Sequence, residues 1–334
     1  MCRLCRRGFL TGAAALAAHT ALPAFAQFPG AIKPQNDPYA QVDPYADPRN
    51  GFPSTPQSAV PSQGRKSPFQ GAPLTDEDKA EIEVGRAALR YWVKQGGGPY
   101  PDERLQKALR DYCAPLFAVA ERSNLPWAVV LLNDPSVNAS AGPGGQVMVN
   151  IGLIHMCDHP AELASVLAHE IGHVDFRHSV NDGPVSELIK LAREKGMGRY
   201  TPELIEKLIP EAAMENVSRA ADEKPKLDIF DLAENGFTRQ DEVQADEHVA
   251  MIFSRLGIDM RYAVSMHKKL MKLNDDSGGE PPVFLNNHPA SADRVDATAM
   301  LAATSPKPRT EFVYVGWDVL KAAFPTTPKF KGIF

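Results

Sequence analysis

The sequence predicts an α+β fold that is mainly helical, with a small sheet and one central helix. Three observations lead to this prediction. Several stretches have the apolar period of amphipathic helices, two short strand-like runs flank a turn-rich segment, and one helical stretch carries no Lys or Arg. The chain has 334 residues, of which 43% are hydrophobic. This length and composition supply a sizeable core, so a wholly disordered chain is not expected.

The first 26 residues resemble an export signal. Arg6-Arg7 precedes an uncharged Ala/Leu-rich run, which is typical of the twin-arginine route, and Ala24-Phe25-Ala26 resembles a cleavage site. An ordinary secretory signal and an uncleaved anchor are the alternatives. All three place the domain outside the cytoplasm, and we expect it in a bacterial periplasm. No later apolar stretch is long enough for a transmembrane span in the mature chain.

Residues 27–74 are predicted to form a disordered linker, because they are rich in Pro, Gln, Ser, Asn and Gly. A near-repeat, Asp37-Pro-Tyr-Ala and Asp43-Pro-Tyr-Ala, lies within it. Pro-rich segments also bind aromatic grooves, so a recognition arm is the alternative interpretation.

Residues 75–334 form the predicted folded domain. Thr75 and Asp78 have capping-box spacing and open an amphipathic helix that ends at the glycines 96–98. A second helix is expected from about 102 to 123, followed by strands at 127–132 and 146–150 on either side of a turn-rich segment. The two predicted strands therefore come before the helix that carries the candidate catalytic residues.

A helix is predicted from Pro160 to Phe176, and its unusual feature is His169-Glu170-x-x-His173. Two imidazoles four residues apart lie one turn apart on one face, so they can bind a single zinc ion. Glu170 could then take a proton from water that zinc has made acidic, which is the chemistry of peptide hydrolysis at neutral pH. Two buried histidines without a metal are the alternative, because the motif also occurs by chance.

Another helix is predicted to begin at Thr238, and Glu242 and Asp246 share one of its faces. Glu242 would complete three protein ligands and leave one position open, as in catalytic zinc sites. Asp246 could accept a hydrogen bond from a ligand imidazole and fix its tautomer. Without the first helix, solvated surface acids would be the simpler interpretation.

These two motifs, in this order and spacing, resemble the gluzincin metallopeptidase family that includes the CAAX prenyl protease, HtpX and the soluble periplasmic peptidases LoiP and BepA. The resemblance covers about residues 75–300. Two departures leave the partner and substrate open: membrane-spanning helices as in the prenyl protease are missing, and so are C-terminal tetratricopeptide repeats as in BepA. Other matching segments are 138–153, 162–168, Arg177-His178, and His288-Pro289 with Arg294.

The resemblance implies a zincin-like fold and one zinc ion per chain. It implies that His169, His173 and Glu242 are the zinc ligands and that Glu170 is the general base and acid. Asp246 would accept a hydrogen bond from a ligand imidazole.

The resemblance also implies that His288 lies near the metal. There it would either stabilise the oxyanion or act as a displaceable extra ligand that holds the enzyme inactive. Arg294 would support the same loop or the oxyanion. Helix capping is the structural alternative for both residues.

Two further segments have functional interpretations. We expect the strand at 146–150 to be an exposed edge that binds extended peptides, with a buried strand as the alternative. Residues 179–237 are expected to form a helical lid over the cleft, with plain helical packing as the alternative. The strand residues are Gln146, Val147, Met148, Val149 and Asn150.

The net charge and the cysteines bear on the possible partners and on disulfide formation. The net charge of -5 argues against nucleic acid as a partner. Cys113 and Cys157 could form a disulfide in an oxidising compartment or remain free, because the sequence gives no distance between them.

The sequence thus predicts a zinc metalloendopeptidase whose partners are polypeptides, namely misfolded or unassembled cell-envelope proteins. A periplasmic chaperone or assembly factor with latched or low proteolytic activity is the alternative, and a structural zinc protein is a second one.

Overall fold

The computed structural model describes residues 72–95, 98–181, 186, 189–190, 237–276, 284–285, 288–289, 291–308 and 311–326. The predicted signal lies outside these residues, as do the predicted linker up to residue 71 and most of the predicted lid at 179–237.

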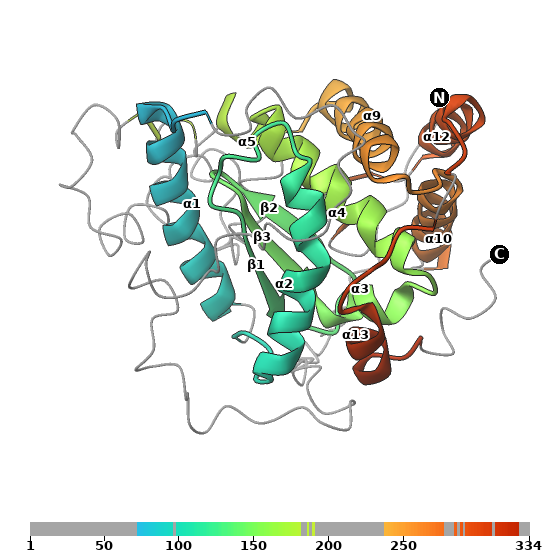
Figure 1. Ribbon diagram of the computed structural model, residues 1–334, viewed down its shortest axis with the longest axis horizontal. Coiled ribbons are helices and arrows are strands. Elements are labelled where there is room, and N and C mark those ends of the chain that lie inside the picture. The colour runs from blue at the N-terminus through green and yellow to red at the C-terminus, as the bar shows by residue number, and fades with distance from the viewer. Residues whose placement is uncertain are drawn as a thin grey trace, which may run out of the picture. The chain divides into compact units, whose positions relative to one another are not determined.

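The described part is mainly helical with one small sheet, which confirms the predicted α+β class (Figure 1). The strands are β1 (Ala128–Leu132), β2 (Ala139–Gly142) and β3 (Gln146–Asn150). The helices are α1 (Asp76–Gln95), α2 (Glu103–Ala118), α3 (Ile151–Met156), α4 (Pro160–Asp175), α5 (His178–Asn181), α9 (Arg239–Leu256), α10 (Arg261–Asp276), α12 (Ala292–Thr304) and α13 (Trp317–Ala323).

Capping explains where the two long outer helices begin. The Thr75 hydroxyl accepts a hydrogen bond from the Asp78 N–H at 3.1 Å, and the Asp78 carboxylate accepts one from the Thr75 N–H at 2.8 Å. Thr238 and Asp241 make the same reciprocal pair at the start of α9. Both helices therefore start where the sequence predicts.

Helix α2 is shorter than the predicted range 102–123 and ends at Ala118. The N–H groups of Glu121 and Arg122 donate to the Asp175 carboxylate at 2.7 and 2.9 Å. Because a carboxylate from the end of α4 takes these N–H groups, they do not continue the ladder of α2.

The sheet order is β1-β3-β2, with β3 parallel to β1 and antiparallel to β2. The prediction that residues 146–150 are an exposed edge is therefore wrong. All five residues are buried, and β3 pairs with a strand on each side, so its backbone is already used. The corrected segment comprises Gln146, Val147, Met148, Val149 and Asn150.

Helix α4 is central, as expected, and packs against β2, α2, α9 and α10 (Figure 1). Its residues from Ala161 to Val174 are all buried. A Cβ at Gly172 would lie 3.0 Å from the His248 Cβ and 3.1 Å from the Ala245 Cα on α9. Glycine at this position allows α9 to approach α4 closely. This close approach brings side chains of α9 next to those of α4 at the candidate site.

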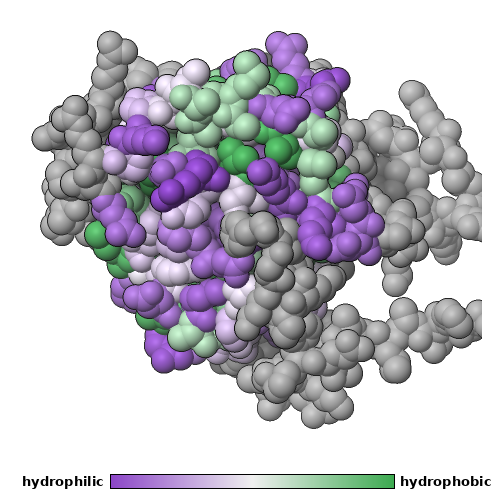
Figure 2. Space-filling view, turned by 90° about the vertical axis from the view of Figure 1, so that its right-hand side faces the viewer, coloured by the Kyte–Doolittle hydropathy of each residue, from purple (hydrophilic) through white to green (hydrophobic). Residues whose placement is uncertain are grey.

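The surface on the α10 and α12 side is mostly hydrophilic among the described residues, with an apolar area near the top of Figure 2. None of the described helices has both the length and the apolar character that a membrane crossing requires. Cys113 and Cys157 are free thiols in the buried core.

Candidate metal centre

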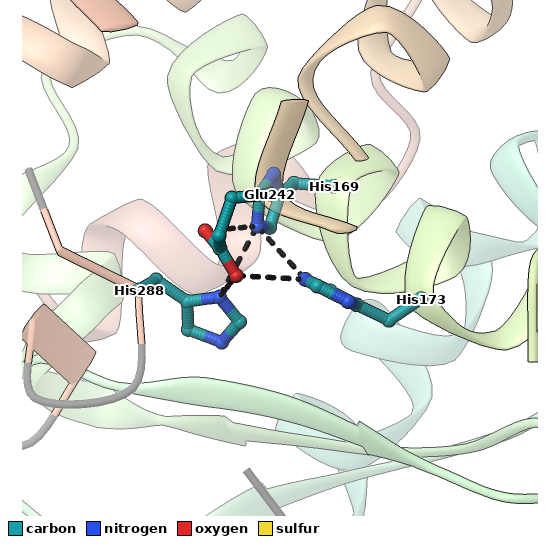
Figure 3. Close-up of side chains that lie close together, drawn as sticks. All are labelled: His169, His173, Glu242 and His288. Atoms are coloured by element: carbon teal, nitrogen blue, oxygen red, sulfur yellow. Dashed lines mark hydrogen bonds and ion pairs between the residues drawn. The ribbon is translucent and has the colours of Figure 1, made fainter. Parts of the chain in front are cut away.

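Four side chains from three segments meet in the interior (Figure 3). His169 and His173 come from α4, Glu242 comes from α9, and His288 comes from the segment between α10 and α12. One nitrogen or oxygen atom from each lies within 4.8 Å of the others, and all four residues are buried. The helix period and the close approach of α9 at Gly172 bring His169, His173 and Glu242 together.

The ligand atoms face one another. Nε2 of His173 lies 3.1 Å from Nε2 of His169, and each nitrogen lies 3.5 Å from an oxygen of Glu242. Nδ1 of His288 lies 2.9 Å from Oε1 of Glu242 and 3.2 Å from Nε2 of His169. Three imidazoles and one carboxylate thus point at one position.

Glu170 lies beside this cluster on the side of the sheet. Its Oε2 accepts a hydrogen bond from the N–H of Ala141 in β2 at 3.1 Å. Its Oε1 is buried, has no hydrogen-bond partner among the described residues, and lies 3.5 Å from Nε2 of His288. Burial raises the pKa of Glu170, although the nearby His288 and His169 act in the opposite direction. A carboxyl with a raised pKa is suited to taking and releasing a proton.

Asp246 and Arg294 form hydrogen bonds and ion pairs with the candidate metal ligands. Nδ1 of His169 donates to Oδ1 of Asp246 at 3.0 Å. Arg294 donates to both oxygens of Asp246 at 2.8 Å, and its Nη1 lies 2.8 Å from Oε2 of Glu242. Burial opposes the ionised form of Asp246, but hydrogen bonds from Arg294 and His169 hold its pKa well below the usual range. Arg294 therefore connects two carboxylates of the site.

The two histidines of α4 differ electrostatically. Burial, together with the neighbouring His169 and His288, lowers the pKa of His173 well below its usual value. Burial also lowers the pKa of His169, but hydrogen bonds to Asp246 and Glu242 outweigh it and raise the pKa to about 9. The surroundings therefore favour the neutral form of His173, the form that binds a metal, and favour the protonated form of His169.

The donor set fits a divalent transition metal. Imidazole and carboxylate suit such ions, and the buried, unpartnered Oε1 of Glu170 lies next to the cluster. Helix capping does not explain His288 and Arg294, because the N-cap of α12 is Ser291, whose hydroxyl accepts from the Arg294 N–H at 3.2 Å.

Two histidines to which the sequence analysis assigns no role belong to the surroundings of the site. Nδ1 of His178 lies 2.9 Å from Nδ1 of His173, and Nε2 of His267 lies 3.4 Å from Oδ1 of Asp246. The pair Arg177-His178 was a signal for the first, because it belongs to the family-like pattern. No sequence signal pointed to His267.

Comparisons with known proteins give one matching family and several similar proteins. The model of the family described as Peptidase family M48 matches residues 101–301. The mitochondrial metalloendopeptidase OMA1 of Arabidopsis thaliana is 27% identical over 194 residues, covering 58% of this chain and 35% of that protein. The beta-barrel assembly-enhancing proteases of Yersinia pestis and Escherichia coli K12 are 32% and 28% identical, covering 64% and 61% of this chain. The matches span 43% and 41% of those two relatives, so the chain matches less than half of each relative's length.

Proposed function

This chain belongs to peptidase family M48, and from that premise we propose that it is a zinc-dependent endopeptidase of the bacterial cell envelope. The observation that carries the proposal is the convergence of His169, His173 and Glu242 with an unpartnered Glu170 oxygen beside them. His169, His173 and Glu242 would hold one zinc ion per chain.

The chemistry follows from the positions of the side chains. Zinc, when bound, supplies Lewis acidity that polarises the peptide carbonyl and makes water acidic near neutral pH. Oε1 of Glu170 takes the proton of the attacking water, and Glu170 then gives that proton to the leaving amine nitrogen. The N–H of Ala141 holds the other oxygen, Oε2, in place.

His288 and Arg294 have separate tasks in this mechanism. Nε2 of His288 is buried without a hydrogen-bond partner in the described structure, and with a hydrogen on this nitrogen the ring would donate to the oxyanion that forms from the peptide carbonyl. Arg294 keeps Glu242 and Asp246 ionised and in position. Asp246 fixes the tautomer of His169, so that Nε2 of this ring presents its lone pair.

The substrate is proposed to be an extended polypeptide. Strand β2 is an edge of the sheet, and Ala141 within it contacts Glu170 directly. An extended chain could pair with such an edge through its backbone, largely independently of sequence. Misfolded or unassembled envelope proteins present such segments, and two of the relatives are named beta-barrel assembly-enhancing proteases.

The proposed location is the periplasm. It rests on the twin-arginine pattern of residues 1–26 and on the same relatives. We also propose that residues 27–74 form a Pro-rich disordered linker and that residues 179–237 form a helical lid over the cleft.

A second candidate is a periplasmic chaperone or assembly factor whose proteolysis is latched. The position of His288 favours it, because its Nδ1 lies within 2.9 Å of Glu242 and 3.2 Å of His169, as a fourth ligand would. In that state the imidazole takes the place that water needs.

Cleavage assays with unfolded substrates test the proposed function. The zinc-loaded full chain is incubated with an unfolded β-barrel outer-membrane protein, with the same protein folded in detergent, and with casein. We expect internal cleavage of the unfolded chains, with loss of cleavage on chelation. Intact unfolded substrates in the presence of bound zinc would overturn the endopeptidase proposal and support the latched candidate.

A further inference from the structure

His173 is the first member of a hydrogen-bonded chain that leads away from the cluster. Its Nδ1 lies 2.9 Å from Nδ1 of His178, and Nε2 of His178 lies 3.0 Å from Oε1 of Gln244 on α9. We propose that His178 and Gln244 are positioning residues that fix the tautomer of the zinc ligand His173. This inference rests on the proposed function, because it assigns His178 and Gln244 a role in zinc binding by His173.

The acceptors at the far end set the direction of the chain. Nε2 of His178 faces two oxygens, Oε1 of Gln244 at 3.0 Å and Oδ1 of Asp241 at 3.5 Å, so this nitrogen carries a hydrogen. A neutral imidazole has one N–H, and Nδ1 of His178 is then an acceptor. His173 therefore donates from Nδ1, and its Nε2 keeps the lone pair that faces Glu242.

The opposite direction is incompatible with a metal. If Nδ1 of His178 donated to His173, a neutral His173 would carry its hydrogen on Nε2, the atom that points into the cluster. Metal binding thus selects the arrangement in which His178 accepts. The Nδ1 atoms of the two histidine ligands on α4 donate to different kinds of acceptor. His169 donates to the carboxylate of Asp246, and His173 donates to the imidazole of His178.

The backbone at the end of α4 brings His178 back toward the site. Helix α4 ends at Asp175, and Arg177 adopts a left-handed conformation with φ of 58°. His178 follows at once, and its ring centroid lies 5.0 Å from that of His173. A left-handed residue with a side chain is unfavourable unless its surroundings stabilise it.

Helix α1 supplies that stabilisation. The Arg177 guanidinium lies 2.9 Å from Glu77, 2.8 Å from Asp78 and 3.1 Å from Glu81. The Glu81 side chain is fully buried, which makes this attachment less exposed to solvent screening than a surface pair. Helix α1 therefore helps to hold His178 in reach of His173, although α1 supplies no ligand to the cluster.

The test compares two substitutions of Gln244 that differ in one property. Gln244→Met keeps the approximate size but removes the acceptor oxygen, whereas Gln244→Glu keeps an acceptor. His178→Phe removes both ring nitrogens, and His155→Phe is the matched control, because the His155 ring contacts Pro325 and Phe324 instead. Zinc affinity of the metal-free full chain is measured by competition with a chromophoric chelator.

We expect His178→Phe to weaken zinc binding by about 10- to 100-fold, as loss of a ligand's outer hydrogen bond does. Gln244→Met should weaken it by about 10-fold, the lower end of that range, because Oδ1 of Asp241 remains 3.5 Å from Nε2 of His178. Gln244→Glu and His155→Phe should stay within about threefold of the parent, well below that effect. Equal zinc affinity of the parent and Gln244→Met would overturn the proposal, and so would an equal loss in both Gln244 variants. If His178→Phe does not fold, the Gln244 pair decides the question.

A spectroscopic readout separates this inference from the proposed function. In the ¹⁵N-histidine-labelled, metal-free chain we expect a through-hydrogen-bond coupling between Nδ1 of His173 and Nδ1 of His178, with the hydrogen on His173. Absence of the coupling, or a hydrogen on His178, contradicts the proposed chain. If the parent bound no zinc but showed the coupling, the zinc proposal would fail while the hydrogen-bonded arrangement stood.

Discussion

Oε1 of Glu170 and Nε2 of His288 lie 3.5 Å apart, and neither atom has a hydrogen-bond partner among the described residues. Both atoms are buried next to the four-residue cluster, where an unpaired polar group is costly. The two residues come from segments 118 positions apart, and the fold aims their free atoms at the same space. Such a pair is suited to handling a proton and a developing negative charge.

Removing the His288 imidazole separates its two proposed roles. If this residue donates to the oxyanion, His288→Ala should lower kcat by about 100-fold with a smaller change in KM. Zinc should remain bound, because His169, His173 and Glu242 are retained. Casein cleavage and metal content measure both effects, with His155→Ala as the control. A rise in cleavage would instead show that His288 is an inhibitory ligand.

Substitution of Asp246 should lower zinc affinity more than it impairs folding. Asp246→Asn removes the charge that accepts from His169 and pairs with Arg294. We expect zinc binding to weaken by about 10- to 100-fold. The matched control is Asp293→Asn, since the Asp293 side chain is 74% exposed and pairs at the surface with Arg239. Chelator competition measures the change, and equal affinities of the two variants would contradict the role of Asp246.

The close contact of α4 and α9 should be sensitive to one methyl group. The added Cβ of Gly172→Ala would meet the His248 Cβ at 3.0 Å and push α9, which carries Glu242, away from α4. We expect a loss of about 1–3 kcal/mol in unfolding free energy, together with weaker zinc binding. Gly257→Ala at the end of α9 is the control: it has room for a Cβ but a φ of 69°. It should lose stability, by about 1 kcal/mol, and keep its zinc affinity. Unchanged zinc affinity in Gly172→Ala would contradict the contribution of this contact to the site.

Asp78 should make stability dependent on pH at the acidic end. Burial opposes its ionisation, but hydrogen bonds from Thr75 and the Arg122 guanidinium lower its pKa to about 2, from 3.8. A carboxyl with a lowered folded-state pKa contributes its stability above pH 4 and loses it as the pH falls through 2. The contribution is about 1–2 kcal/mol.

Urea unfolding between pH 6 and pH 2 measures this contribution. The parent should exceed Asp78→Asn in stability at pH 6, and the difference should shrink toward pH 2. Asp76→Asn is the control, because that side chain is 80% exposed and pairs with Lys79 at the surface. A pH-independent difference for Asp78→Asn would contradict the assigned pKa shift.

Much of the candidate site could be predicted from the sequence, because the helix period alone places His169 above His173 and Glu242 beside Asp246. The central helix and the capped starts of α1 and α9 could be predicted for the same local reasons. Pairing between strands is not local. The apolar run of β3 has the same pattern at an edge or in the centre, and only the sheet order shows that β3 is central and that β1 and β2 are the edges.

The surroundings of the site also depend on tertiary contacts. The place of His178 follows from a left-handed Arg177, which charges on α1 stabilise from about 100 positions away in the sequence. The early end of α2 depends on Asp175 at the end of α4. Local patterns do not contain either contact.

The most direct test of the central claim measures zinc content and casein cleavage side by side for the full chain and for Glu170→Gln. Glutamine keeps the shape and the acceptor for the Ala141 N–H but cannot take a proton. We expect one zinc ion in each protein and a loss of cleavage in the variant by several orders of magnitude. Cleavage by Glu170→Gln at the parent's rate, or a parent that binds no zinc, would contradict the assignment of this site.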